Sequence, residues 1–288
     1  LHRTPCCGRN VEYYSEDPVL SGFLAAAYAQ GAYSKGLIAA GKHFAFNDQE
    51  TNRNGVAPFM TEQKARELEL RSFQIAFENG MLGTMTAFNR IGTTYVSAHE
   101  GLIDGILRGE WGFDGFVVTD YTAISEMIDH GIGDLQEVSA RALTAGTDMD
   151  MVADGFIGTL EKSLKEGKVT EADIDKACRR ILEAKYKLGL FANPYKYCDV
   201  KRAEKEVFTP EHRSIARQIA TETFVLLKNQ DNLLPLQRKG NIALIGPLAN
   251  TRANMPGTWS VAATADKYST LLEGFKNSVG SKANILYA

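Results

Sequence analysis

The chain has 288 residues and a formal net charge of −3, with 44% hydrophobic and 23% charged residues. These are ordinary globular proportions, whereas disorder requires few apolar residues and a large net charge. The mild acidity disfavours a nucleic-acid-binding protein. The sequence contains no run of about 18 apolar residues, so no transmembrane helix is expected.

The cysteines and the first residue leave the compartment open. Adjacent Cys6 and Cys7 lack the spacing of zinc ligands, so ordinary buried or surface thiols are expected. Because the chain begins at Leu1 and not at Met, a leader could have been removed. Cytoplasmic and secreted locations are therefore both retained.

The first 190 residues alternate between short apolar runs and segments with helical periodicity. Residues 38–45 form the first run, and a helix predicted from Thr61 to Asn79 follows it. Residues 82–88 form the second run, and Ser97 with Glu100 then gives a capping-box pattern. The later runs and helices of this half cover residues 115–120, 134–146, 147–151, 159–167 and 170–189.

Four consecutive strand–helix units predict a parallel α/β sheet, either doubly wound or a (β/α)8 barrel. The barrel is favoured because Lys42, His43, Asp120 and Asp150 stand at or near strand ends, where barrel enzymes build their active sites. No G-x-G-x-x-G segment follows any of these strands, so nothing in the sequence favours the dinucleotide-binding fold.

We expect residues 1–191 to be the C-terminal part of the barrel, 192–212 a linker, and 213–288 the start of a second α/β domain. In that second domain, a helix from Ser214 to about Lys228 precedes an apolar strand at 242–245, and a further strand is expected near 286–288. A full barrel needs about 250 residues. The chain therefore has the pattern of a fragment truncated at both ends.

Asp120 is the strongest candidate for chemistry because it ends a very apolar strand. An ionised carboxylate there can attack an electrophilic carbon or hold a cation. The competing interpretation is that Asp120 caps the next helix through N–H groups near Ala123.

Lys42, His43 and Arg9 could each contact a ligand or have another role. Lys42 and His43 would point to opposite faces of a regular strand, so the backbone must kink for both to reach one ligand. A snorkelling lysine with a packed histidine is the alternative, and a Schiff-base lysine is another. Arg9 suits either a bidentate contact to a ligand or an ion pair with Glu12 or Asp17.

Other polar and aromatic positions have weaker functional interpretations. Asp148 and Asp150 would share a strand face, but helix capping or loop anchoring is the default over a metal site. Trp111 is expected to be a packing residue, and Trp259 could face a ligand. The polar loop after His43 could bind sugar or be a solvated turn; it contains Asn47, Asp48, Gln49, Glu50, Asn52 and Arg53.

Several ordered stretches resemble glycoside hydrolase family three, the β-glucosidase-like group. Residues 8–18 resemble its G-R-x-x-E-x-(Y/F)-x-E-D-P segment, and residues 42–53 its K-H-F-A-x-N-x-Q-E-x-x-R segment. Residues 110–120 resemble E-W-G-F-D-G-x-V-V-(S/T)-D, and 226–236 resemble the start of the family's second domain. Together these matches are specific and span nearly the whole chain.

The resemblance implies a retaining exo-glycosidase that releases β-linked glucose from oligosaccharides or glucosides, with a barrel followed by an α/β sandwich. It implies that Asp120 is the nucleophile and that Arg9, Lys42 and His43 bind hydroxyls of the sugar. Met85 and Tyr121 are further residues expected to bind the substrate. The mechanism needs no metal or organic cofactor, and a homo-oligomer is left open. The partner is a small sugar, with neither nucleic acid nor membrane.

Departures from the family pattern leave the exact sugar open. Phe88 stands where the family usually has Tyr, and Tyr121 where it usually has Trp. No Glu matches the family's general acid/base, which lies further along in two-domain members. β-Xylosidase activity and a catalytically incomplete sugar-binding fragment are therefore the alternatives. The N-acetylglucosaminidase branch is disfavoured because residues 42–47 lack its K-H-F-P-G-H-G pattern.

Overall fold

A computed structural model of the chain describes residues 1–53, 55–257, 259–260 and 262–288, which fold into two compact units. The first unit is Leu1–Cys198 and the second is Asp199–Ala288. The boundary lies within the 192–212 segment, which also contains helix α8 (Val200–Glu206).

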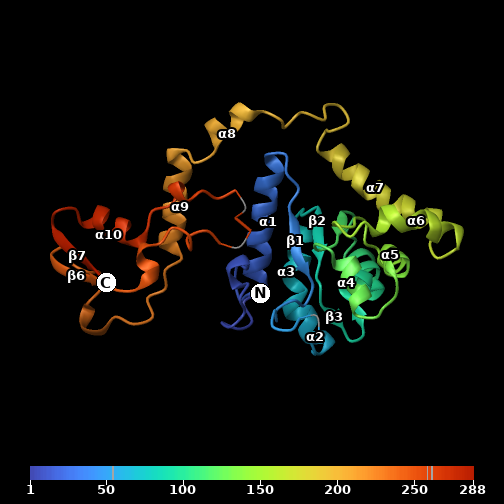
Figure 1. Cartoon of the computed structure of the whole chain (residues 1–288), viewed down its shortest axis with the longest axis horizontal. Helices are drawn as coiled ribbons and strands as arrows, with labels where there is room; N and C mark the ends of the chain where they lie inside the picture. The colour runs from blue at the N-terminus through green and yellow to red at the C-terminus, as the bar shows by residue number, and fades with distance from the viewer. Residues whose placement is uncertain (54, 258, 261) are drawn as a thin grey trace. The chain divides into compact units, whose positions relative to one another are not determined.

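A parallel three-stranded sheet is the centre of the first unit, with strand order β1 (Ala40–Phe44), β2 (Gly83–Thr86) and β5 (Phe116–Val118). A short antiparallel pair joins β3 (Arg90–Ile91) to β4 (Thr94–Tyr95). The sheet confirms the three parallel strands expected from the first three apolar runs (Figure 1).

The fourth run does not form the expected strand. Its described backbone makes one parallel bridge, between Met149 and Val118. The Asp148 carboxylate accepts the Val117 N–H at 2.8 Å, and the N–H groups of Asp148 and Met149 both donate to the Val117 carbonyl. A side chain thus takes a backbone donor that a regular ladder would use.

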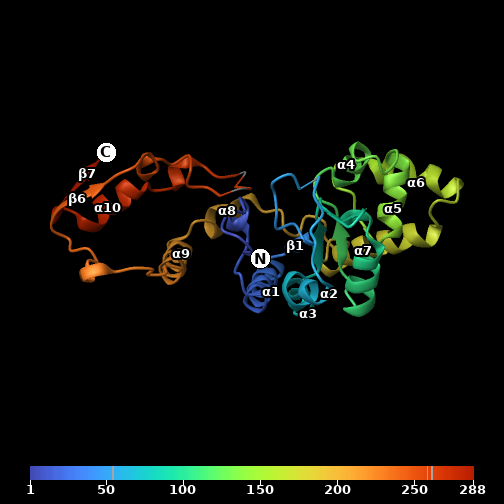
Figure 2. The ribbon, with the colours of Figure 1, turned by 90° about the horizontal axis from the view of Figure 1, so that it is seen from below.

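Helices cover the sheet, and α4, α5 and α6 lie together away from α1 in both views (Figures 1 and 2). Helix α1 packs against α3, and α5 packs against α6. The α-helices of this unit are α1 (Pro18–Ser34), α2 (Glu62–Lys64), α3 (Arg71–Glu78), α4 (Ala123–Asp129), α5 (Leu135–Thr144), α6 (Gly155–Lys165) and α7 (Glu171–Lys187). π-Helical segments cover Ala65–Glu69 and Gly101–Glu110, and 3-10 turns cover Asn10–Glu12 and Val96–Ala98.

Most helix boundaries follow from capping residues, but one expected cap is wrong. Thr61 caps α2 as expected. Ser97 does not cap the next helix, because its buried Oγ is 2.7 Å from Thr86 Oγ1; His99 Nδ1 instead accepts the Leu102 N–H. Helix α6 begins at Gly155, before the expected residue 159.

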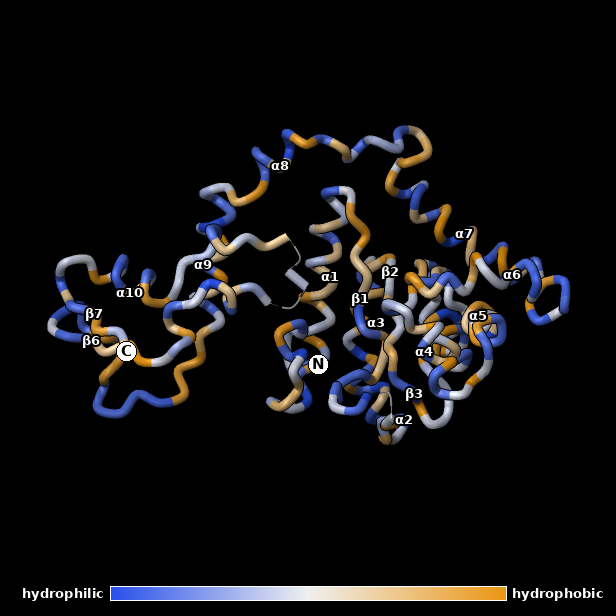
Figure 3. The backbone as a smooth tube through the Cα atoms, viewed as in Figure 1, coloured by the Kyte–Doolittle hydropathy of each residue, from blue (hydrophilic) through white to orange (hydrophobic). Residues whose placement is uncertain are grey.

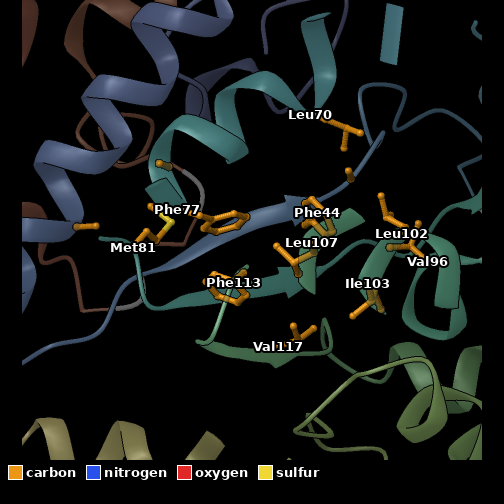
Figure 4. Packing of buried hydrophobic residues seen from close by; sticks show 13 residues of the cluster. Phe44, Leu70, Phe77, Met81, Val96, Leu102, Ile103, Leu107, Phe113 and Val117 are labelled. Atoms are coloured by element: carbon orange, nitrogen blue, oxygen red, sulfur yellow. The ribbon is translucent and has the colours of Figure 1, made fainter. Parts of the chain in front are cut away.

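The hydrophobic core lies between the sheet and its helices (Figure 4). The Phe44 ring contacts Phe73, Phe77 and Trp111, with centroid distances of 5.2, 6.2 and 6.1 Å. Trp111 is thus a packing residue, as expected. Figure 4 also shows Phe44 of β1 beside Leu107 of the Gly101–Glu110 segment, so the core joins these two elements. This packing holds the C-terminal end of β1 in a fixed position.

The second unit contains one parallel strand pair, β6 (Gly240–Leu244) with β7 (Ala283–Tyr287), linked through α10 (Leu271–Val279). Short 3-10 turns cover Gln230–Asn232, Pro247–Asn250 and Ala265–Lys267. Helix α9 spans Pro210–Glu222, so it begins earlier and ends earlier than the expected 214–228. Pro210 at the first helical position and the Thr209 cap explain the early start.

Orange and blue segments alternate along α7, as in a helix with one apolar and one polar face (Figure 3). Among the residues that the structure describes, no helix combines the length and the apolar character needed to cross a membrane.

Candidate active site

Asp120 lies just after β5, where its carboxylate meets side chains from other elements. Its Oδ1 accepts the Tyr121 N–H at 2.7 Å, and its Oδ2 is 3.1 Å from His43 Nε2. Helix α4 begins after Thr122 with no side-chain cap. The helix-capping interpretation of Asp120 is therefore wrong, and the carboxylate is available to the site.

The site favours an ionised Asp120. Burial of the carboxyl group opposes ionisation, but the hydrogen bonds from His43 and from the Tyr121 N–H outweigh it. The nearby Lys42 charge adds to the same effect, so the pKa of Asp120 lies below its usual value.

Lys42 and His43 reach the same cluster from β1. The β1–β2 register shifts between Gly41 and Phe44. Lys42 Nζ lies 3.1 Å from Glu12 Oε2, while His43 contacts Asp120. Strand β1 is therefore irregular at Lys42 and His43, as expected if both side chains are to reach one ligand.

Arg9 links the Lys42–Glu12 pair to the His43–Asp120 pair. Its Nε and Nη2 donate to the two oxygens of Glu12 at 2.7 and 2.9 Å, and its Nη1 donates to Glu50 Oε1 at 3.2 Å. Nη2 also lies 3.1 Å from His43 Nε2. Burial would lower the pKa of Arg9, but the two carboxylates raise it above its usual value.

Glu12 and Glu50 are central residues of the site. The sequence offered Glu12 only as an ion-pair partner of Arg9, which is confirmed, and Glu50 only as one member of the polar loop after His43. Glu12 contacts both Arg9 and Lys42, and Glu50 accepts from Arg9, Asn47 and Arg53. The sequence signal was spacing, because Glu12 lies three positions after Arg9 and Glu50 three positions before Arg53, and buried charges are normally paired. The polar loop after His43 is therefore partly built into the site.

The two remaining candidates have different positions. Met85 is half-buried on β2 with Val118 as its cross-strand neighbour, and Tyr121 directly follows Asp120 with 59% of its surface exposed. Phe88 lies beneath Arg53, whose guanidinium carbon is 4.3 Å from the ring centroid. Trp259 belongs to the second unit and is exposed.

Asp148 and Asp150 anchor the backbone, as the default interpretation predicted. Asp148 is paired with Arg108 at 2.6 Å and Arg180 at 2.8 Å. Asp150 Oδ2 accepts the N–H groups of Gly155 and Phe156, which caps α6. This cap also explains the early start of that helix. The four cysteines, all in the described part of the chain, are free thiols.

Glu69 provides a pH-dependent contribution to stability outside the Asp120 cluster. Burial and a hydrogen bond with Asp48 raise its pKa to about 8, although Arg3 Nε lies 3.0 Å away and acts in the opposite direction. The folded chain then binds a proton that the unfolded chain has released, so stability should fall as pH rises from about 5 to 8. We expect Glu69→Gln to flatten this fall in urea unfolding curves; an unchanged slope would contradict the assignment.

Comparisons with known proteins agree with the motifs in this cluster. Residues 1–184 match the sequence profile described as the glycosyl hydrolase family 3 N terminal domain, and residues 224–287 match the glycosyl hydrolase family 3 C-terminal domain.

Two curated relatives align with the entire chain. The periplasmic β-glucosidase of Salmonella typhimurium is 35% identical over 299 residues, covering 100% of this chain and 39% of that protein. The thermostable β-glucosidase B of Acetivibrio thermocellus is 34% identical over 291 residues, covering 100% of this chain and 36% of that protein. The chain thus spans less than half the length of these relatives.

The fold is also similar to that of a solved structure. The β-glucosidase from Listeria innocua, determined in complex with glucose, aligns with a TM-score of 0.90 and 31% sequence identity. The alignment covers 99% of this chain and 40% of that chain. The expected α/β fold is therefore confirmed.

Proposed function

The chain belongs to glycoside hydrolase family 3, and on that premise we propose that it carries the nucleophile half of a retaining, exo-acting β-glucosidase. The single observation that supports this proposal most is the placement of Asp120. Its buried, ionised carboxylate contacts His43, which in turn lies beside Arg9.

The proposed reaction uses two displacements at the anomeric carbon. Asp120 attacks that carbon, the bond to the leaving-group oxygen breaks, and a glycosyl ester forms on the aspartate. The leaving oxygen takes a proton from a second carboxyl group, and that group later deprotonates the water that cleaves the ester. The sugar is released with its configuration retained.

The cations around Asp120 have a defined part in this scheme. We assign Arg9 and Lys42 to the sugar hydroxyls, His43 to the nucleophile side of the sugar site through its contact with Asp120, and Met85 and Tyr121 to apolar and aromatic walls. Arg9 and Lys42 are oriented by Glu12 before substrate arrives. Preoriented donors of this kind can bind sugar hydroxyls without reorganising, and hydrogen bonds to these hydroxyls can strengthen in the transition state.

The same placement disfavours a Schiff-base lyase. Lys42 Nζ is in an ion pair with Glu12, a contact suited to a charged ammonium group. A Schiff base requires the neutral amine as nucleophile.

We propose that the parallel sheet β1–β2–β5 is part of a (β/α)8 barrel and that the β6–β7 pair begins an α/β sandwich. The support is the parallel strand order and the position of Asp120 at a strand's carboxyl end, which is where barrel enzymes place catalytic groups.

Covalent trapping tests the proposal. A 2-fluoro glucoside with an activated aryl leaving group needs no acid to depart, so the chain should gain one fluoroglucosyl group, detected by intact mass and mapped to Asp120. A matched 2-fluoro xyloside tests the β-xylosidase alternative, and faster labelling by it would transfer the assignment to xylose. Absence of any adduct on the folded chain, or an adduct on another residue, would contradict the proposal.

A further inference from the structure

The imidazole of His43 stands between a donor and an acceptor that compete for one nitrogen. Its Nε2 is 3.1 Å from Asp120 Oδ2 and 3.1 Å from Arg9 Nη2. The side chain is only 1% exposed. Its other nitrogen, Nδ1, is buried and has no hydrogen-bond partner among the residues that the structure describes.

One neutral tautomer satisfies these contacts better than the other. A neutral imidazole has one N–H, so Nε2 can donate to Asp120 or accept from Arg9, but not both. With the proton on Nδ1, a buried donor would lack an acceptor, and the Nε2 lone pair would face a carboxylate. With the proton on Nε2, Asp120 receives a hydrogen bond and Nδ1 is left as an unpaired acceptor. The Arg9 N–H that faces Nε2 then has no acceptor there, while Arg9 Nη2 keeps its hydrogen bond to Glu12 Oε2.

The cationic form of the ring is disfavoured by its surroundings. The charged groups that face His43 are Asp120, Arg9 and Lys42. Burial and the two cations lower the pKa of His43 and outweigh the contribution of Asp120. The ring is therefore neutral at pH 7.

We propose that His43 is a positioning residue for the nucleophile: its neutral Nε2–H tautomer holds Oδ2 of Asp120, and Arg9 is the partner that replaces Asp120 when the carboxylate charge is lost. The catalytic part of this inference rests on the proposed function; the tautomer does not. With Oδ1 held by the Tyr121 N–H, both carboxylate oxygens are fixed, so the carboxylate cannot rotate freely.

Nitrogen NMR of the histidine-labelled chain tests the tautomer without any catalysis. The chain has five histidines, and the signal missing from His43→Gln identifies His43. We expect a protonated, pyrrole-type Nε2 and a pyridine-type Nδ1 at pH 7. A pyridine-type Nε2 or a cationic ring would overturn the proposal.

The Asp120→Asn variant should reverse the tautomer. The oxygen of the new side-chain amide must face the Tyr121 N–H, so its NH2 group faces His43, and Nε2 becomes an acceptor for both that NH2 group and Arg9. The proton then moves to Nδ1, and the two nitrogen signals exchange character. Asp150→Asn, remote from this ring, is the control and should leave the tautomer unchanged; a failure of Asp120→Asn to change it would also overturn the proposal.

Labelling kinetics test the positioning role. His43→Gln keeps an N–H donor at about the position of Nε2, whereas His43→Met removes it. We expect the maximal rate of labelling by the 2-fluoro glucoside to fall about 10- to 100-fold in His43→Met and much less in His43→Gln, as for one hydrogen bond to a charged group. Equal losses in both variants would contradict positioning through the donor.

The pH profile separates positioning from a merely structural role. The His43 hydrogen bond lowers the pKa of Asp120, so its removal should move the acid limb of the labelling rate to higher pH in His43→Met. An unmoved acid limb would overturn the proposal. If the parent chain forms no adduct at all, the proposed function fails while the NMR result still decides the tautomer.

Discussion

Asp120→Asn should reduce the rate of covalent labelling by an activated 2-fluoro glucoside by at least about 10³-fold, because the amide oxygen is a much weaker nucleophile than the carboxylate. The substitution nearly preserves side-chain volume, and the amide oxygen can still accept the Tyr121 N–H. Binding of glucose should therefore survive. Intact mass after timed incubation measures labelling, and calorimetry measures binding.

Asp150→Asn is the matched control because Asp150 also follows an apolar run but caps α6 through backbone N–H groups. We expect labelling to be retained, with a stability loss of about 1 kcal/mol, as for a weakened helix cap. If Asp120→Asn labels as fast as the parent chain while Asp150→Asn loses labelling, the nucleophile assignment is wrong.

The second large effect concerns stability. Asp148→Ala should lower the free energy of unfolding by about 3–5 kcal/mol, because it removes one side of a buried ion pair. The Asp148 side chain is 0% exposed and contacts Arg108, Arg180 and the Val117 N–H. Its loss would leave the Arg108 guanidinium, which is only 7% exposed, without its carboxylate partner.

Urea unfolding followed by circular dichroism measures this loss. Asp114→Asn is a suitable control, since that side chain is 77% exposed and lies 3.7 Å from Lys187. An exposed pair of this kind should change stability by less than about 0.5 kcal/mol. A loss for Asp148→Ala no larger than that of the control would show that the arginines find other partners or solvent.

Local signals predicted most of the first unit. Apolar runs identified β1, β2 and β5. The helices expected from residues 61, 134 and 170 begin there, where Thr61, Asp134 and Thr170 cap α2, α5 and α7. These features depend on neighbouring residues, which a single sequence shows directly.

Non-local contacts were harder to predict. The 147–151 run has a strand-like pattern, yet Asp148 replaces part of the backbone ladder with a side-chain contact to Val117. Ser97 has the pattern of a cap, yet its partner is Thr86 on a strand. In both cases tertiary contacts overrode the local pattern.

The candidate site was partly predictable for the same reason. Asp120 stood out because a charged residue ends an apolar strand. The role of Arg9 remained open between a ligand contact and an ion pair, and that of His43 between a ligand contact and packing. Only the fold shows that Arg9 lies beside His43, 34 positions away in sequence, and that Glu50 completes the same cluster.

Glu12 also bears on how this site can evolve. One carboxylate serves both Arg9 and Lys42, so a substitution at any of the three positions alters the environment of the other two. Such shared partners make mutational effects non-additive. Drift at these positions is therefore expected to be epistatic. If the proposed sugar site is correct, a new sugar preference should arise more readily from Tyr121, which is not a member of the Arg9–Glu12–Lys42 network.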